Sequence, residues 1–282
     1  MMKKNLLLIL MCFVCGLVYA HDGLNFRNLD VKSGISDNYV RSVLRDQYGF
    51  MWFATLNGLN RYDGYQFKKY TTTQLGAYNN DIESIAEDAA GNIWIKGPVS
   101  YYIYDREQDK LENKIQPVLN KYGITGEVSY LTVDKDYNLW CTVMDTLFHY
   151  DFAKSKLHTF QLPGKEKMQQ VVCRRSCAYL LFSNGEIARI DSNFQHIRPE
   201  TRRTISSGLQ YNLYIDTVDR LWFYASHASG LQCYDTNQKQ WIDYVGRQEV
   251  TDALITAVMD DGDGNLWIGT DDKGVYLSLI HI

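Results

Sequence analysis

One short pattern recurs along this 282-residue chain and constrains its fold more than any other feature. It reads Asp, two variable residues, Gly, one variable residue, an apolar residue and Trp, and its first copy runs from Asp46 to Trp52. The turn positions are Asp46, Gly49, Asp88, Gly91, Asp134, Asp216, Asp261 and Gly264, and the aromatic positions are Trp52, Trp94, Trp140, Tyr179, Trp222 and Trp267. Successive aromatic positions lie 42, 46, 39, 43 and 45 residues apart. A period of this length with strand-like content is typical of β-propeller blades.

Each repeat predicts the strands of one blade. In the first copy, residues 50–54 are bulky and apolar, as in a strand buried on both faces, and residues 66–70 alternate polar and aromatic, as in an outer strand. A single sheet of this kind cannot bury both faces, whereas blades around an axis cover one another. We therefore predict an all-β propeller of four-stranded antiparallel blades, with the repeated aromatic residue packed between neighbouring blades.

The first half of the pattern predicts a tight turn. The Asp side chain is expected to cap the turn, and the Gly to adopt a positive φ. Tyr137 and Asp219 replace the Gly in the third and fifth copies, and the fourth copy has Cys173-Arg-Arg-Ser176 where the Asp turn belongs. We expect distorted turns at these three places. An apolar pair spaced by three precedes four of the turns: Val40 and Val43, Ile82 and Ile85, Val128 and Leu131, Ile255 and Val258.

The last turn also resembles a calcium loop. Asp261, Asp263, Asn265 and Asp272 stand at positions 1, 3, 5 and 12, but Leu266 occupies the sixth position, where the sharp bend of such a loop needs Gly. The other copies have no such oxygen cluster. We therefore predict a turn rather than a metal site, and no required metal or cofactor.

The first twenty residues are read as a cleaved signal peptide. Lys3 and Lys4 precede an apolar stretch, and Ala20 ends it before His21. The alternative is a membrane anchor, for which the stretch is short. We expect the remaining chain to be exported to a periplasm.

Charge and cysteine content restrict the partners and the chemistry. The net charge of -4 argues against a nucleic-acid partner, since such domains usually carry a basic face. Four cysteines follow the signal peptide: Cys141, Cys173, Cys177 and Cys233. An oxidising compartment permits a Cys173–Cys177 bridge, while the alternative that we favour is four buried thiols.

The segment from Gly34 to Val40 and the segment from Asp46 to Gly64 resemble the two-component regulator propeller family. They read G-I-S-D-N-Y-V and then D-x-x-G-F-x-W-x-x-T-x-x-G-L-x-x-Y-D-G. The resemblance extends over about residues 24–276. It implies the periplasmic sensor region of a hybrid two-component histidine kinase that detects oligosaccharides from glycan breakdown. It also implies a membrane-anchored, homodimeric full-length protein and seven-bladed rings, of which this chain supplies six blades.

Two expectations concern the ends of the propeller, which we place at residues 21–276. Residues 25–29 are read as an orphan outer strand that closes the ring. Residues 277–282 match one reading frame of a transposon end used in sequencing libraries, so we interpret them as a non-native tail. The alternative is a genuine apolar C-terminus.

Two other classes of function stay open, a propeller enzyme such as a lyase or glycosidase, and an interaction scaffold. His149, His158, His196 and His227 share no position in the repeat and are not expected to converge, and the repeated Asp residues have a structural explanation. We therefore assign no catalytic residue. The sequence does not identify ligand-binding residues, and Trp241 is expected to lie in an outer strand rather than to form a sugar platform.

Overall fold

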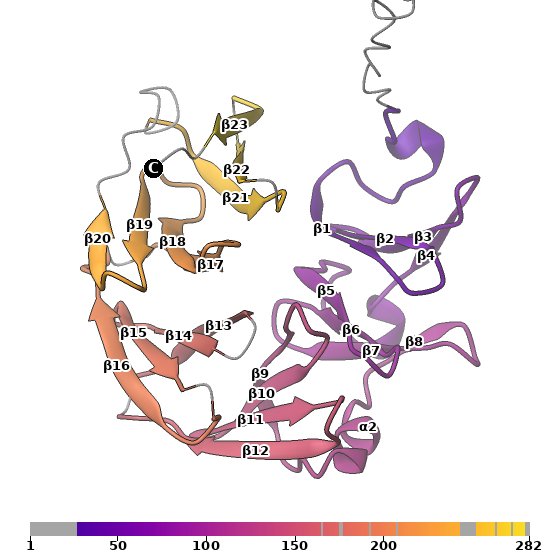
Figure 1. The fold of residues 1–282 in the computed structure, drawn as a ribbon. Coiled ribbons are helices and arrows are strands. Elements are labelled where there is room, and N and C mark those ends of the chain that lie inside the picture. The colour runs from indigo at the N-terminus through magenta and orange to yellow at the C-terminus, as the bar shows by residue number, and fades with distance from the viewer. Residues whose placement is uncertain are drawn as a thin grey trace, which may run out of the picture.

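The computed structural model describes residues 27–164, 166–174, 177–191, 193–206, 208–242, 252–262, 264–271 and 273–279. In this part of the chain, 23 strands form six antiparallel sheets that follow one another around a ring (Figure 1). Five sheets have four strands, and the sixth has three strands within the described residues. The predicted all-β propeller is confirmed, and each sheet corresponds to one sequence repeat and is called a blade below.

The strands follow one another in each blade in the order of the sequence. The first blade is β1 (Val40–Arg45), β2 (Met51–Thr55), β3 (Gly58–Tyr62) and β4 (Phe67–Tyr70). The second is β5 (Ser84–Glu87), β6 (Ile93–Lys96), β7 (Tyr101–Asp105) and β8 (Lys110–Glu112), and the third is β9 (Val128–Val133), β10 (Leu139–Val143), β11 (Thr146–Asp151) and β12 (Lys156–Gln161). The fourth is β13 (Met168–Arg174), β14 (Cys177–Phe182), β15 (Glu186–Ile190) and β16 (Ile197–Arg202), and the fifth is β17 (Tyr211–Ile215), β18 (Arg220–Ala225), β19 (Leu231–Asp235) and β20 (Gln240–Ile242). The sixth is β21 (Ile255–Asp260), β22 (Asn265–Thr270) and β23 (Val275–Leu279).

Three short helices accompany the described strands. They are η1 (Val31–Ser33), η2 (Thr73–Leu75) and α2 (Gln116–Lys121). No helix in the described ranges is both long and apolar enough to cross a membrane.

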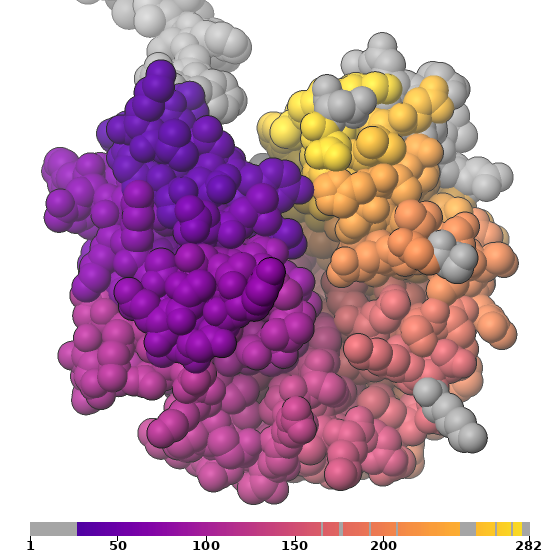
Figure 2. Space-filling view, turned by 180° about the vertical axis from the view of Figure 1, so that it is seen from behind, coloured from indigo at the N-terminus to yellow at the C-terminus, as the bar shows by residue number. Residues whose placement is uncertain are grey.

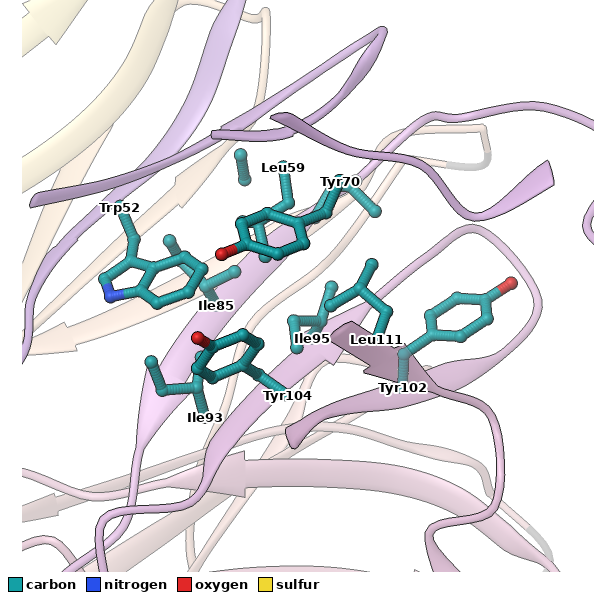
Figure 3. Close-up of a cluster of buried hydrophobic side chains, with 11 residues drawn as sticks. Trp52, Leu59, Tyr70, Ile85, Ile93, Ile95, Tyr102, Tyr104 and Leu111 are labelled. Atoms are coloured by element: carbon teal, nitrogen blue, oxygen red, sulfur yellow. The ribbon is translucent and has the colours of Figure 1, made fainter. Parts of the chain in front are cut away.

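The repeated aromatic residue of each of the first five blades faces the following blade. Trp52 of the first blade packs with Ile85 and Ile93 of the second, and its ring centroid lies 4.8 Å from that of Tyr104 in an edge-on contact (Figure 3). Trp94, Trp140, Tyr179 and Trp222 contribute in the same way to the next four interfaces, and all five residues are at most 2% exposed. The core of the protein therefore lies between the blades, as the repeat predicts.

Trp267 differs from the other five and corrects our expectation of six equally buried residues. It is only half-buried, whereas its neighbours Leu266 and Ile268 are fully buried against the fifth blade. Side chains alternate across a strand, so Trp267 lies on the opposite face, beside its partners Met259 and Leu277. Those partners are 56% and 46% exposed, because no described blade covers this face.

The first blade has a matching uncovered face. Val40 and Val43 are 39% and 53% exposed, although the corresponding Ile82 and Ile85 of the second blade are buried. The first and sixth blades face each other around the ring, and a furrow runs between their indigo and yellow atoms in Figure 2. The apolar pair before each turn is therefore core only where a preceding blade covers it.

Inner strands of neighbouring blades are tied by side chains that bond to backbone. The Tyr130 hydroxyl accepts a hydrogen bond of 3.0 Å from the amide of Val171 in the next blade. The Gln170 amide group bonds both the N–H and the C=O of Leu213, at 2.7 and 3.1 Å. Inner strands are edge strands with unpaired backbone groups, and these ties satisfy some of them.

The N-terminal expectation of an orphan strand is wrong for the described residues 27–29, which form no strand. Asp30 instead caps the short helix η1 through its carboxylate, which accepts from the amides of Lys32 and Ser33. Residues 1–26, including the predicted signal peptide and Phe26, lie outside the described residues.

At the other end, Leu277 to Leu279 continue β23 and pair with β22. Leu277 is the cross-strand partner of Trp267 in the sixth blade, and Arg61 is the corresponding partner of Trp52 in the first blade. Residues 280–282 lie outside the described residues, so the interpretation of residues 277–282 as a non-native tail stays a prediction.

Candidate functional site

The Asp turns of the first three blades line a common hollow. Its volume is about 370 Å³, and its walls are Arg45, Asp46, Gln47, Glu87, Asp88, Ala89 and Tyr137. Each turn joins the innermost strand of its blade to the second strand, so these residues share one face of the ring. This hollow is the candidate ligand site that the turns create.

The Asp of each turn binds both the turn and the repeated Trp. Oδ1 of Asp46 accepts hydrogen bonds from the amides of Tyr48 and Phe50 at 3.0 and 2.9 Å, and Oδ2 accepts from Nε1 of Trp52 at 2.9 Å. The same Asp–Trp bond recurs at 2.8 to 3.2 Å in the second, third, fifth and sixth blades: Asp88–Trp94, Asp134–Trp140, Asp216–Trp222 and Asp261–Trp267. Sequence reasoning predicted the cap but missed the bond to the indole, whose signal was the constant spacing of six residues.

The fourth turn position has the same backbone conformation in all five complete copies. Gly49, Gly91 and Gly264 have φ values of 89°, 81° and 91°, as predicted. Tyr137 and Asp219 adopt the left-handed region as well, at 62° and 65°. The expected distortion of the third and fifth turns is therefore wrong, because the hydrogen bonds of the Asp hold even these residues at a positive φ.

The acidic groups in the hollow already have partners. Glu87 accepts from the amide of Gln47 at 2.9 Å, and Arg106 bridges Glu87 and Asp46 at 2.8 and 3.2 Å. Burial raises the pKa of Glu87 and of Asp88, and their hydrogen bonds oppose that shift. Since both groups are used inside the protein, the hollow offers a ligand chiefly Arg45, Gln47 and Tyr137, which are exposed.

Tyr137 is the aromatic element of this hollow. It is 56% exposed, and its carbonyl accepts from the amide of Ala89 at 3.0 Å, which ties the third turn to the second. An exposed aromatic ring beside amide and guanidinium groups can stack on a sugar ring and bond its hydroxyls. The arrangement is suited to binding, and the carboxylates of the hollow are engaged by Gln47, Arg106 and Trp94.

Two histidines do converge, contrary to expectation. His149 and His158 face each other across β11 and β12, with ring centroids 5.6 Å apart. His149 also stacks on Trp140 at 4.0 Å and is 1% exposed. Its Nε2 lies 3.9 Å from Oδ2 of Asp134, too far for a hydrogen bond, and burial lowers the pKa of His149 to about 4. The ring is therefore neutral at neutral pH and closed to a substrate.

Another histidine, His227, lies beside an acidic residue on the surface. Nδ1 of His227 is 3.0 Å from Oδ2 of Asp271, and both side chains are about half exposed. Neither residue lines one of the two hollows described for this chain. The pair is accessible to solvent.

The other residues that the sequence singles out are the cysteines, Trp241 and the calcium-like turn. All four described cysteines are free thiols, and Cys141, Cys173 and Cys233 are buried. Trp241 lies in the outer strand β20, as predicted, and donates to the Thr201 hydroxyl at 3.0 Å. At the calcium-like turn, Asp261 accepts from Asn265 and Trp267, while Asp263 and Asp272 lie outside the described residues. Within the described ranges no cluster of three or more acidic, His or Cys side chains is placed to hold a metal ion.

Two segments of the chain, residues 34–57 and 250–272, match the family model of the two component regulator propeller. The chain carries repeats of that family. They coincide with the beginning of the first blade and with the sixth blade, and they confirm the resemblance drawn from the turn motif. A comparison with curated proteins finds no match.

Solved structures share the same fold. The extracellular domain of BT3049 from B. thetaiotaomicron, described as a hybrid two-component system, is similar with a TM-score of 0.64 and 21% identity over 90% of this chain. The corresponding domain of BT4673 from the same organism gives 0.61 and 20% over 92%. The chain spans only 35% and 36% of those two structures.

An enzyme has the fold as well. A catalytically inactive variant of virginiamycin B lyase from Staphylococcus aureus, with quinupristin, is similar with a TM-score of 0.64 and 16% identity. The match covers 93% of this chain and 86% of the lyase. At such identities the likeness concerns the fold, so function has to be argued from the site.

Proposed function

We propose that this chain is the ligand-sensing propeller of a hybrid two-component signalling protein. The observation that carries the proposal is the pair of matches to regulator-propeller repeats, at both ends of a ring that shares its fold with two extracellular domains of such systems. The similar domains are extracellular, which supports a location outside the inner membrane. We extend this to a periplasmic location, with a signal peptide, a membrane anchor, a homodimer and a histidine kinase in the complete protein.

The proposed ligand is an oligosaccharide released by glycan breakdown. Support comes from the hollow at the first three turns, where exposed Tyr137, Gln47 and Arg45 combine an aromatic face with polar groups. Sugar binding commonly needs such a combination, because the faces of a sugar ring are apolar and its edges carry hydroxyls. Nothing about this surface requires chemical conversion of the ligand.

A propeller lyase is the second candidate, favoured by the likeness to virginiamycin B lyase. An enzyme needs an acid–base group that reaches a bound substrate. Among the described residues, His227 lies beside Asp271 on the surface, and neither residue lines the two hollows described here. The geometry therefore supports binding better than catalysis.

The test is a binding screen of the purified chain against a panel of neutral and acidic oligosaccharides by calorimetry. We expect one class to bind and Tyr137→Ala to weaken its binding about tenfold, as the loss of a stacked aromatic contact would. Tyr78→Ala is the matched control, because Tyr78 is fully exposed and lies outside the hollow. Product formation that is abolished by His227→Ala would instead establish the lyase.

A further inference from the structure

The departure of the fourth repeat from the pattern opens a second cavity. Its volume is about 240 Å³, and it lies between the fourth and fifth blades. Its walls are Arg174, Cys177, Tyr179, Arg189, Ile215, Asp219, Thr236 and Asn237. In this blade Tyr179 replaces the repeated Trp, and the turn lacks the Asp that elsewhere fills the equivalent place.

Two arginines in the cavity wall have hydrogen-bond donors that are not used, and these donors indicate the kind of group that would bind there. Arg174 donates through Nη2 to the carbonyl of Thr217 at 2.9 Å, and Arg189 donates through Nη2 to Sγ of Cys177 at 3.0 Å. The Nε of each guanidinium is buried and has no hydrogen-bond partner among the described residues. A buried cationic donor without a partner is costly, so a group that accepts from both would be bound favourably.

Other blades show which partner such an arginine takes. Arg106 lies 3.2 Å from the turn carboxylate of Asp46, and Arg220 lies 2.8 Å from that of Asp216. The fourth blade contributes Arg174 and Arg189 to the cavity wall, but its turn has no carboxylate. The cavity therefore has two arginines and one acid, Asp219, in its wall and lacks the turn carboxylate that other blades have.

The nearby acids offset the charge of the two arginines only in part. Oδ1 of Asp219 forms an ion pair with Nε of Arg174 at 3.4 Å, but Nε makes no hydrogen bond to it. The pKa of Arg189 is raised first by its bond to Cys177 and to a smaller extent by the charge of Glu200, which itself accepts a hydrogen bond from Tyr234 at 3.1 Å. The pocket thus keeps a cationic wall that is rich in hydrogen-bond donors.

We propose that this cavity binds the carboxylate or sulfate group of an acidic saccharide. The inference rests on the proposed function, which it deepens by naming the ligand class. A guanidinium holds a planar oxyanion through paired hydrogen bonds, which makes Arg the suitable residue for this task. The volume equals that of about eight water molecules, enough for the anionic group and part of a sugar ring. Asn237 is exposed in the cavity wall and can bond the sugar hydroxyls, whereas the Thr236 hydroxyl donates to the carbonyl of Asp219 at 2.6 Å.

The experiment measures binding of oligogalacturonate, of a neutral galactose oligosaccharide of equal length, of a sulfated galactose oligosaccharide and of inorganic sulfate to the purified chain. We expect one of the two acidic sugars to bind at least about tenfold more tightly than the neutral sugar, the value for a hydrogen bond to a charged group. Binding of oligogalacturonate would indicate a carboxylate ligand, and binding of the sulfated sugar would indicate a sulfate ligand. Added salt should weaken the binding.

Variants locate the binding. Arg189→Gln and Arg174→Gln should each reduce the affinity for the acidic sugar about tenfold, and Arg189→Lys should reduce it as well, since Lys keeps the charge but loses the paired donors. Arg202→Gln is the control, because Arg202 is exposed in the same blade and loses the same charge. Thermal melts without ligand show that each variant is folded.

The reactivity of Cys177 reports directly on whether the cavity is occupied. It is a partly exposed thiol in the cavity wall, whereas Cys141, Cys173 and Cys233 are buried. A bound acidic sugar should slow its modification by a thiol reagent, measured by peptide mass spectrometry, and the neutral sugar should not.

The outcomes separate this inference from the proposed function. Binding of a neutral sugar that the arginine variants leave unchanged would overturn the anion site and retain the sensor. Arginine-dependent binding of inorganic sulfate without any sugar binding would retain the anion site and overturn the saccharide proposal. Equal affinity of the folded Arg189→Gln variant for an acidic sugar would also overturn the anion site.

Discussion

Nε1 of Trp94 donates a hydrogen bond of 2.8 Å to Oδ2 of Asp88, six residues earlier in the chain. The bond links the turn at the end of the innermost strand to the side chain that fills the next blade interface. A single repeated motif therefore specifies a turn, a strand register and an interface at once. The four predictions that follow test what these parts contribute.

Removing the indole should be costly where the following blade covers it. Trp94 is 2% exposed, so Trp94→Ala should lower the free energy of unfolding by about 3–5 kcal/mol. Trp267 is only half-buried, and Trp267→Ala should cost roughly half as much or less, because less apolar area is lost. Chemical denaturation of both variants checks the comparison. Equal losses would show that cover by the next blade does not determine the contribution of the residue.

The carboxylate of Asp88 should stabilise the protein because it accepts several hydrogen bonds. Asp88 accepts from the amides of Ala90 and Asn92 through Oδ1, as well as from Trp94. Asp88→Ala leaves these donors without a partner and should cost about 3 kcal/mol, while Asp88→Asn keeps one accepting oxygen and should cost less. The measurement is again the free energy of unfolding. Asp105→Asn is a control at a less buried turn of the same blade, and a similar loss there would contradict the role given to Asp88.

The buried histidine should make stability fall in acid. The pKa of His149 is lowered to about 4 in the folded protein by burial, against about 6.5 in an unfolded chain. Between these values the unfolded state binds a proton that the folded state does not, so stability is lost as the pH falls from about 6.5 to about 4. The loss attributable to His149 should be about 2 kcal/mol between pH 7.5 and pH 5.

The check on this pH dependence is His149→Phe, which keeps an aromatic ring against Trp140 and Phe194 but cannot titrate. Its free energy of unfolding should fall less steeply than that of the parent protein over the same pH range. Parallel curves for the two proteins would mean that His149 does not titrate with the pKa that its burial implies.

Replacing Tyr137 of the third turn by Gly, the usual residue of the repeat at this position, should stabilise the protein. Tyr137 holds a φ of 62°, a region that disfavours a side chain, so Tyr137→Gly should raise the free energy of unfolding by about 1 kcal/mol. Asp136→Gly is the matched control, because Asp136 is not among the residues with positive φ and gains only chain entropy when unfolded. The control should destabilise the protein. A destabilised Tyr137→Gly would show that the tyrosine side chain contributes more than its strain costs.

The repeat predicted the blades because its residues recur at matching places, such as Trp52 and Trp94. The ties of Tyr130 and Gln170 were not predicted, because blades use different side chains for the same task and the bonded residues lie more than 40 positions apart. The pairing of His149 with His158 could have been derived by folding the hairpin between them about its turn. The cavity at Arg174 and Arg189 could not, since it depends on which donors stay unpartnered in three dimensions.

Each of the first five aromatic residues of the repeat is covered by the blade that follows it, so the repeat that is copied along the chain and the core that packs are different units. Duplication copies a whole repeat, but every core contains residues from two consecutive copies, as Trp52 and Tyr104 do. A change at the aromatic position of one copy therefore alters a core that this copy shares with its downstream neighbour. The Tyr179 of the fourth copy accordingly shares its core with Leu213, Leu221 and Phe223 of the fifth blade.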